Sequence, residues 1–128
     1  QELIMNSQAV LVLGNHAHRD LVEVLSGLGF ASQVWGSMQH SLDKLRHQKF
    51  SAILVDLKFT HADVLEFILN VRDIDKKIPV VVIGHGTDER IDRKIAKQDH
   101  TIVLSEVESG DKLAEKLEQV LNAFSKNN

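Results

Sequence analysis

Short apolar runs alternate with longer amphipathic segments along the whole chain. The apolar runs occupy residues 10–13, 31–35, 51–56, 80–83 and 101–104. The run at 10–13 is continuous, which suits a strand buried on both faces, whereas residues 31–35 predict a shorter, weaker strand. Between and after them, apolar residues recur at helical spacing over residues 17–28, 41–50, 62–74, 88–98 and 111–124. The pattern therefore predicts five strands, each followed by a helix.

This alternation predicts a parallel sheet, because parallel strands need crossover connections and helical crossovers cover both faces of the sheet. The expected architecture is α/β, a flavodoxin-like doubly wound (βα)5 three-layer sandwich with strand order 2-1-3-4-5. Ligands of such folds bind at the carboxyl ends of the strands, near the switch between the first and third strands. In this chain those ends are Gly14-Asn15-His16 and Asp56-Leu57-Lys58, so we expect the functional region there.

Composition narrows the class of protein. The chain has 128 residues with 43% apolar content and no cysteine, which predicts one domain, at residues 8–124, and excludes disulfides and thiolate metal sites. The net charge of −3 is spread along the chain, so we expect no direct contact with nucleic acid. No apolar run approaches the length of a membrane span. We therefore expect a cytoplasmic domain, with residues 1–7 a leader or tag-like segment and residues 125–128 the start of a linker.

A family resemblance follows from three features of the sequence. Asp56 ends the third strand, the fourth begins within Lys77-Ile-Pro-Val-Val-Val-Ile83, and the closing helix contains Lys112-Leu-Ala-Glu-Lys-Leu117. Together with the order of elements, these features resemble the receiver domain of two-component response regulators. The resemblance implies phosphorelay signal transduction, with a phosphoacceptor aspartate that coordinates magnesium together with a neighbouring acid pair.

The supporting residues of the family's site are replaced in this chain. The phosphoacceptor position is kept at Asp56. The other positions of the receiver site are vacated: the acid pair falls on Gly14 and Asn15, the hydroxyl on Gly84, the Lys-Pro pair on Ser105 and Glu106, and the aromatic switch residue on Ile102. Phosphoryl transfer depends on charge neutralisation by such groups. We therefore expect a degenerate pseudo-receiver, not an enzyme and without a cofactor, that acts by protein–protein interaction.

Two alternatives stay open at this stage. Asp56 could still accept a phosphoryl group from a histidine kinase with Mg²⁺, as an atypical receiver. The vacated site could instead sense a small molecule or a metal ion, and His16, Lys58 and His85 are candidate modulators beside it. A dinucleotide site is not expected, because the segment after the first strand has one of the three glycines of such a motif.

The last predicted helix carries an apolar stripe, most of which we expect to pack on the sheet. The resemblance implies that an output domain or a second copy binds through the fourth helix, the fifth strand and the fifth helix. The interface candidates are Leu113, Leu117, Val120, Leu121 and Phe124. The polar tail at residues 125–128 resembles the start of a linker, so we expect the chain to be the amino-terminal regulatory module of a larger transcriptional regulator, joined to an output domain.

Overall fold

The computed structural model describes residues 9–14, 19–60, 63–84, 86–104 and 110–126. Within them lies a five-stranded parallel sheet in the order β2-β1-β3-β4-β5, so the predicted topology is confirmed. Each strand agrees with the prediction to within one residue at either end. The strands are β1 Ala9–Leu13, β2 Ala31–Trp35, β3 Ala52–Asp56, β4 Val80–Ile83 and β5 Thr101–Leu104.

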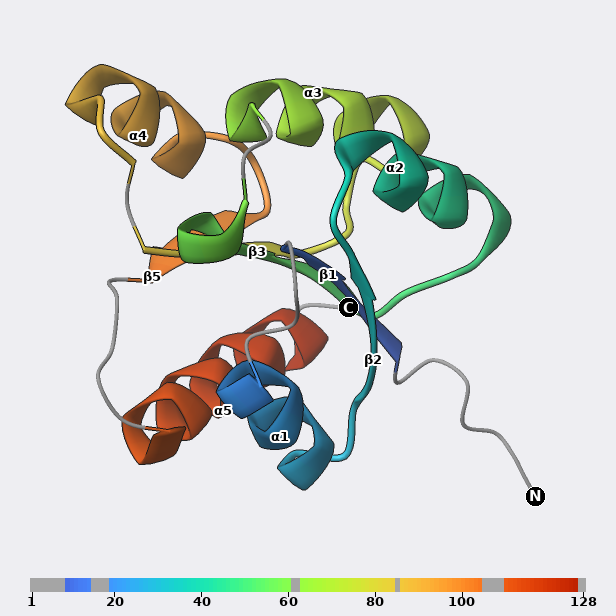
Figure 1. Cartoon of the computed structure of the whole chain (residues 1–128), viewed down its shortest axis with the longest axis vertical. Helices are drawn as coiled ribbons and strands as arrows, with labels where there is room; N and C mark the ends of the chain where they lie inside the picture. Colours follow the sequence, from blue (N-terminus) through green and yellow to red (C-terminus); the bar gives the residue numbers. More distant parts are fainter. Residues whose placement is uncertain (1–8, 15–18, 61–62, 85, 105–109, 127–128) are drawn as a thin grey trace.

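The helices cover both faces of this sheet (Figure 1). On one face lie α1 and α5, and on the other α2, α3 and α4. Their bounds are α1 Arg19–Gly27, α2 Met38–His47, α3 Val64–Ile74, α4 Glu89–Ala96 and α5 Gly110–Lys126, with a short 3-10 turn, η2, at Leu57–Phe59. The structure thus has the three layers that the alternating pattern predicts.

The position of α2 differs most from the prediction. The helix begins at Met38 and ends at His47, three residues earlier at each end than the predicted 41–50. The side chain of Ser37 accepts a hydrogen bond from the backbone N–H of His40 at 3.1 Å and so caps the first turn. Gln48 is already extended, which ends the helix. The cap, rather than the apolar spacing, sets the start of this helix.

Two apolar cores lie on opposite faces of the sheet. Successive residues of a strand point to opposite faces, and in β1 Leu11 packs with α2 and α3 while Val12 packs with α1 and α5. The central strands β1, β3 and β4 are buried almost throughout. The outer strands β2 and β5 are half-buried over most of their length. Within the described part of the chain, no helix is long and apolar enough to cross a membrane.

Arg72 on α3 joins two loops at the amino-terminal edge of the sheet. Its guanidinium donates hydrogen bonds to the backbone oxygens of Asp75 at 3.2 Å, Ile78 at 2.8 Å, Asp99 at 2.7 Å and His100 at 3.1 Å. His100 has a φ of 55°, in the left-handed region that side chains rarely adopt. The loops before β4 and β5 are therefore held in place by one side chain.

Candidate functional site

Asp56 stands at the centre of the carboxyl edge of the sheet. It is the last residue of β3 and pairs with Ile83 of β4, while Val55 pairs with Leu13 of β1. Gly14 and Gly84 follow those two neighbours, and both continue the sheet, since Gly14 N donates to Trp35 O at 2.9 Å and Gly84 N to Leu104 O at 2.8 Å. The topology thus brings Asp56 between two strands that are each followed by a glycine.

The carboxylate of Asp56 is buried and takes part in a turn. Asp56 is 7% exposed, and its Oδ1 accepts a hydrogen bond from the backbone N–H of Lys58 at 3.1 Å. This bond caps η2, the short turn that leads away from β3. Lys58 itself is exposed. The aspartate therefore has a structural role in shaping the loop after β3, whether or not it accepts a phosphoryl group.

Gly84 adopts a backbone conformation that a serine or threonine would resist. Its φ is +98°, and an added Cβ would lie 3.6 Å from Leu57 Cβ, which is an ordinary van der Waals contact. Space is therefore available for a side chain, and the backbone is the obstacle. The hydroxyl that the family resemblance places at this position cannot be restored without strain or a change of the loop after β4.

Thr60 connects the loop after β3 to the end of β1. Its Oγ1 donates a hydrogen bond to the backbone oxygen of Leu13 at 3.0 Å, across 47 residues of sequence. The sequence analysis did not single out Thr60, because a threonine in a loop carries no signal of a partner so far along the chain. The bond holds this loop beside the strand end that precedes Gly14.

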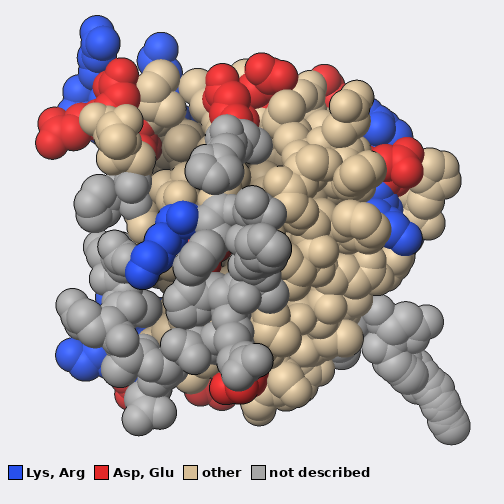
Figure 2. Space-filling model, in the orientation of Figure 1, with Lys and Arg blue, Asp and Glu red and all other residues tan. Residues whose placement is uncertain are grey.

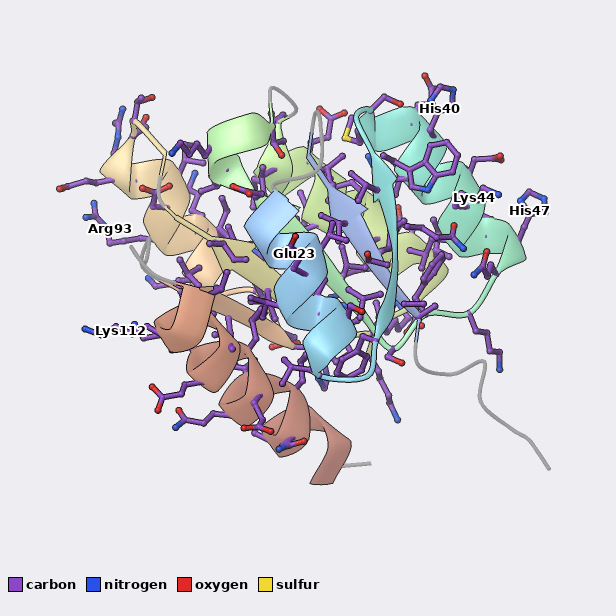
Figure 3. All side chains as sticks on the ribbon, turned by 60° about the horizontal axis from the view of Figure 1, so that its bottom comes forward. Glu23, His40, Lys44, His47, Arg93 and Lys112 are labelled. Carbon is purple, nitrogen blue, oxygen red and sulfur yellow. The ribbon has the colours of Figure 1, made fainter. Side chains whose placement is uncertain are left out.

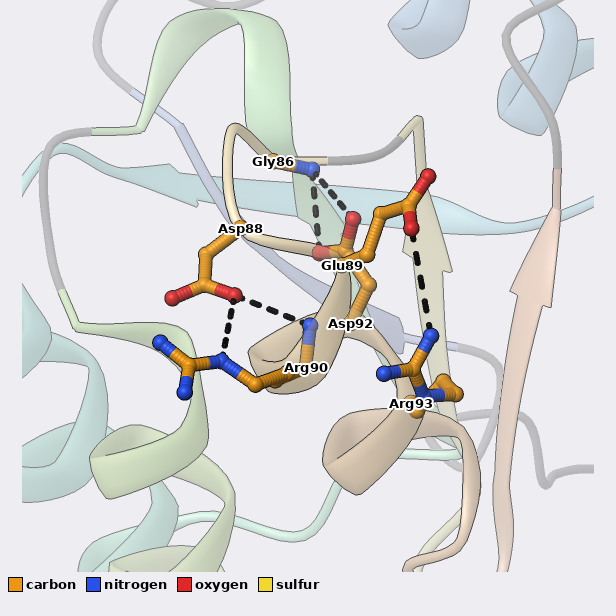
Figure 4. Close-up of polar contacts among 6 residues, drawn as sticks. All are labelled: Gly86, Asp88, Glu89, Arg90, Asp92 and Arg93. Carbon is orange, nitrogen blue, oxygen red and sulfur yellow. Dashed lines mark hydrogen bonds and ion pairs between the residues drawn. The ribbon is translucent and has the colours of Figure 1, made fainter.

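The loop after β4 is fastened to the first turn of α4 (Figure 4). Gly86 N donates to both carboxylate oxygens of Asp92, at 3.0 and 3.2 Å. Asp88 caps the helix by accepting from Arg90 N at 2.9 Å, and it also lies 3.6 Å from the guanidinium Nε of Arg90. The aspartates thus hold the loop and the helix start together.

Magnesium prefers several oxygen ligands in octahedral geometry. Among the described residues, the ends of β1, β3 and β4 bring one carboxylate, that of Asp56, to this edge of the sheet. Among the residues that the structure describes, no group of three or more His, Cys, Asp or Glu side chains could hold a metal ion. Five predicted positions of the site lie outside the described residues: Asn15, His16, His85, Ser105 and Glu106.

The last helix requires a correction of the interface prediction. Leu113, Leu117 and Leu121 are 7%, 0% and 7% exposed and pack in the core between α5 and the sheet. They are therefore unavailable for contact with a partner. Val120 is half-buried against the same core, and the side chain of Phe124 lies outside the described residues. An amphipathic stripe on an outer helix here serves the fold.

The fourth helix offers surface instead. Ile91 on α4 is 37% exposed, and the helix around it carries both basic and acidic residues, of which Arg90 and Arg93 are exposed. Figure 2 shows Lys and Arg side chains over α4, mixed with acidic ones, and Figure 3 shows Arg93 projecting outward from the helix. This helix buries little surface, since Ile95 is its buried residue.

Solved structures of receiver domains share the fold of this chain. A receiver domain protein of the CheY-like type from Methanospirillum hungatei aligns with a TM-score of 0.74 and 16% identity, over 94% of this chain and 98% of that chain. The receiver domain of a sensor histidine kinase from Pseudomonas aeruginosa, which has magnesium coordinated in its active-site cleft, aligns with a TM-score of 0.71 and 14% identity, over 91% and 98%. Full-length FixJ from B. japonicum aligns with a TM-score of 0.73 and 20% identity, over 94% of this chain and 60% of that chain.

These neighbours share the five-stranded flavodoxin-like fold with this chain. At such identities the likeness establishes the fold. No protein-family model matches the sequence, and no curated protein matches it.

Proposed function

We propose that this chain is a receiver-like signal-transduction module whose phosphorylation site is degenerate and which acts through protein–protein contact. The observation that carries the proposal is the position of Asp56 between two strands that are each followed by a glycine. A phosphoryl group on Asp56 would find no side-chain group at Gly14 or Gly84, because glycine has no side chain. Catalysis of phosphoryl transfer rests on positioning and charge neutralisation, which this arrangement does not supply.

Two further features support a domain without a phosphorylation switch. The backbone of Gly84 disfavours a hydroxyl-bearing residue at the end of β4. The loop beyond it is already fastened to α4 through Gly86 and Asp92. A surface used by a partner would then be present in the unmodified protein.

A phosphorylation assay tests the proposal. The domain is incubated with acetyl phosphate and millimolar magnesium, and intact-mass spectra are recorded beside those of Asp56→Asn. We expect no stoichiometric adduct in either protein. An adduct that forms on the natural chain and disappears in Asp56→Asn would refute the degenerate site and establish the alternative, an atypical receiver that a histidine kinase could supply.

A gain-of-function variant gives the positive control. Gly14→Asp combined with Asn15→Asp restores two acids beside Asp56, and like charges that crowd together are relieved by a bound cation. We expect magnesium to raise the melting temperature of this variant in a saturable way and to leave the natural chain unchanged. Binding at a hundredfold the dissociation constant would add about 2.7 kcal/mol to the free energy of unfolding. A saturable shift in the natural chain, lost in Asp56→Asn, would show that a magnesium site persists.

The contact surface is proposed to be the face of α4, β5 and α5, occupied by an output domain or by a second copy. Because the leucines of α5 are buried, we place the apolar anchor at Ile91. Ile91→Asp should weaken association measured by analytical ultracentrifugation. Leu69→Asp is the matched control, since Leu69 on α3 is 50% exposed and lies outside residues 88–124. If Leu69→Asp weakens association and Ile91→Asp does not, the proposed face is wrong.

The remaining parts of the proposal concern the larger protein. We propose that the domain is the amino-terminal module of a cytoplasmic regulator, with a transcriptional output domain as its partner. The full-length relative FixJ, of which the chain covers 60%, supports this arrangement, because the match leaves part of that protein outside the shared fold. Sequencing the complete gene tests it directly: an open reading frame that ends at residue 128 would contradict it.

A further inference from the structure

A cavity lies at the edge of the sheet opposite Asp56. It has a volume of about 460 Å³ and lies between the end of α2, the segment that enters β3, and the end of α3. Binding sites for small molecules commonly occupy about 300–1,000 Å³. Its lining residues are Leu45, Arg46, His47, Gln48, Lys49, Phe50, Ile74 and Asp75. The cavity is therefore large enough for a small ligand and is separate from the site described above.

The inner part of the cavity is apolar. Leu45 is buried in the core between the sheet and α2, and Phe50 and Ile74 are half-buried against that same core. The three side chains come from two helices and a strand entrance that the core packing fixes. A ligand that covered them would remove apolar surface from water, which is favourable in proportion to the area covered.

The rim of the cavity carries unpaired positive charge. Arg46 and Lys49 are exposed, and neither has a hydrogen bond or an ion pair with another of the described residues. His47 projects from the last turn of α2 (Figure 3), with its Nδ1 2.8 Å from the backbone oxygen of Asp43. Asp75 is the acid in the lining, and its Oδ1 already accepts from the N–H groups of Lys77 and Ile78.

The helix dipole accounts for part of this charge. Basic side chains in the last turn of a helix interact favourably with its carbonyl end. This effect applies to Arg46 and His47 in the last turn of α2. Lys49 lies beyond the helix and beyond the extended Gln48 that caps it. In contrast, Arg93 on α4 lies 3.9 Å from an acid of its own helix, Glu89. The dipole therefore explains the charge of Arg46 but not that of Lys49, which is unpaired among the described residues and lies on the rim of a cavity with an apolar floor.

We propose that this cavity binds a small amphipathic anion, with an acyl or aryl body against Phe50 and Ile74 and its carboxylate between Arg46 and Lys49. The carboxylate would pair with the positive charges of these two side chains, and the body of the ligand would cover the apolar floor of the cavity. The proposal is independent of phosphorylation at Asp56, because the cavity lies at the amino-terminal edge of the sheet. It gives the domain a place to register a metabolite.

Sodium octanoate is a suitable probe, with octan-1-ol as the neutral ligand of equal length and acetate as the head alone. Titration of the isotope-labelled domain, followed by backbone amide shifts in NMR spectra, should give saturable changes at residues 45–50 and 74–75. Octan-1-ol and acetate should each bind at least several-fold more weakly, because each offers one of the two features of the cavity.

Charge variants separate this site from general attraction of an anion to the surface. The double variant Arg46→Gln and Lys49→Gln should weaken octanoate binding about fivefold or more, as expected when two charged partners are removed. The matched control, Lys94→Gln with Lys97→Gln on and beside α4, changes the net charge equally and should leave binding unchanged, since both residues are exposed and outside the cavity.

Four outcomes would overturn the proposal. Octanoate could cause no saturable change at residues 45–50 and 74–75, or its effects could centre on the carboxyl edge around Asp56. Octan-1-ol could bind as tightly as octanoate, which would remove the role of charge. The control pair could weaken binding as much as the pair at the cavity. None of these results depends on whether the domain is phosphorylated.

Discussion

Replacing Arg72 by methionine should destabilise the domain by about 3 kcal/mol. Arg72 donates to four backbone oxygens in two loops, and methionine retains most of its apolar stem while removing every donor. A hydrogen bond from a charged group is worth about 1.5–3 kcal/mol when buried, and four such bonds would sum to roughly 6–12 kcal/mol. That sum is an upper limit, because most of the acceptors lie in exposed loops.

The estimate follows from the exposure of each bond. The bond to Ile78 O is part-buried, and we assign it about 2 kcal/mol. The bonds to the oxygens of Asp75, Asp99 and His100 are exposed, so water replaces the lost donor and each contributes about 0.3–0.5 kcal/mol. Burial lowers the pKa of Arg72, while the charges of Asp75 and Asp99 raise it. Removing the guanidinium also removes that desolvation cost, which keeps the net loss near 3 kcal/mol.

Arg72→Lys distinguishes geometry from charge. Lysine keeps the positive charge beside Asp75 and Asp99, but one ammonium cannot reach both loops as the planar guanidinium does. We expect Arg72→Lys to lose at least as much stability as Arg72→Met. A lysine variant that retains most of the stability would show that charge, rather than the bridging of two loops, accounts for the contribution.

Urea unfolding measures these differences. Trp35 is the single tryptophan of the chain and packs against the core, so its fluorescence can follow the transition. Arg93→Met is the control, because Arg93 makes an exposed ion pair on α4, and such pairs contribute at most about 1 kcal/mol. In Arg72→Met, native-state hydrogen exchange should be faster at the backbone N–H of Val80, which donates a hydrogen bond to the backbone oxygen of His100. If Arg72→Met costs no more than Arg93→Met, the reasoning is refuted.

Two further variants test the backbone and the loop at the carboxyl edge. Gly84→Ala should lower the free energy of unfolding in urea by about 1–2 kcal/mol, because Gly84 has a positive φ. Gly27→Ala, at the end of α1 with open space around it, should raise that free energy by up to about 1 kcal/mol. Equal effects of the two substitutions would contradict the assigned strain. Thr60→Val should lose about 1 kcal/mol through the bond to Leu13 O and should raise the hydrogen-exchange rate in the loop after β3, and an unchanged rate would show that the bond does not hold the loop.

Part of this architecture follows from the sequence alone. The strands could be predicted to within one residue, most directly in the centre of the sheet, where β1, β3 and β4 are short, nearly continuous apolar runs. The alternation of strands and helices predicts the strand order, and that order places the end of the strand with Asp56 beside the end of the strand before Gly14. Helix starts were less accurate, since the cap at Ser37 shifted α2 away from its apolar spacing.

Other features were decided by the tertiary structure. The acceptors of Arg72 lie up to 28 residues away, and the acceptor of Thr60 lies 47 residues away, so no local pattern encodes them. Glycine permits a positive φ without requiring one, and the bond from Gly84 to β5 is part of what selects it. The stripe containing Leu117 could equally have bound a partner, because an amphipathic pattern shows that one face of a helix is covered but does not show what covers it. Local sequence fixes which segments form, whereas long-range contacts decide which surfaces and backbone groups remain for function.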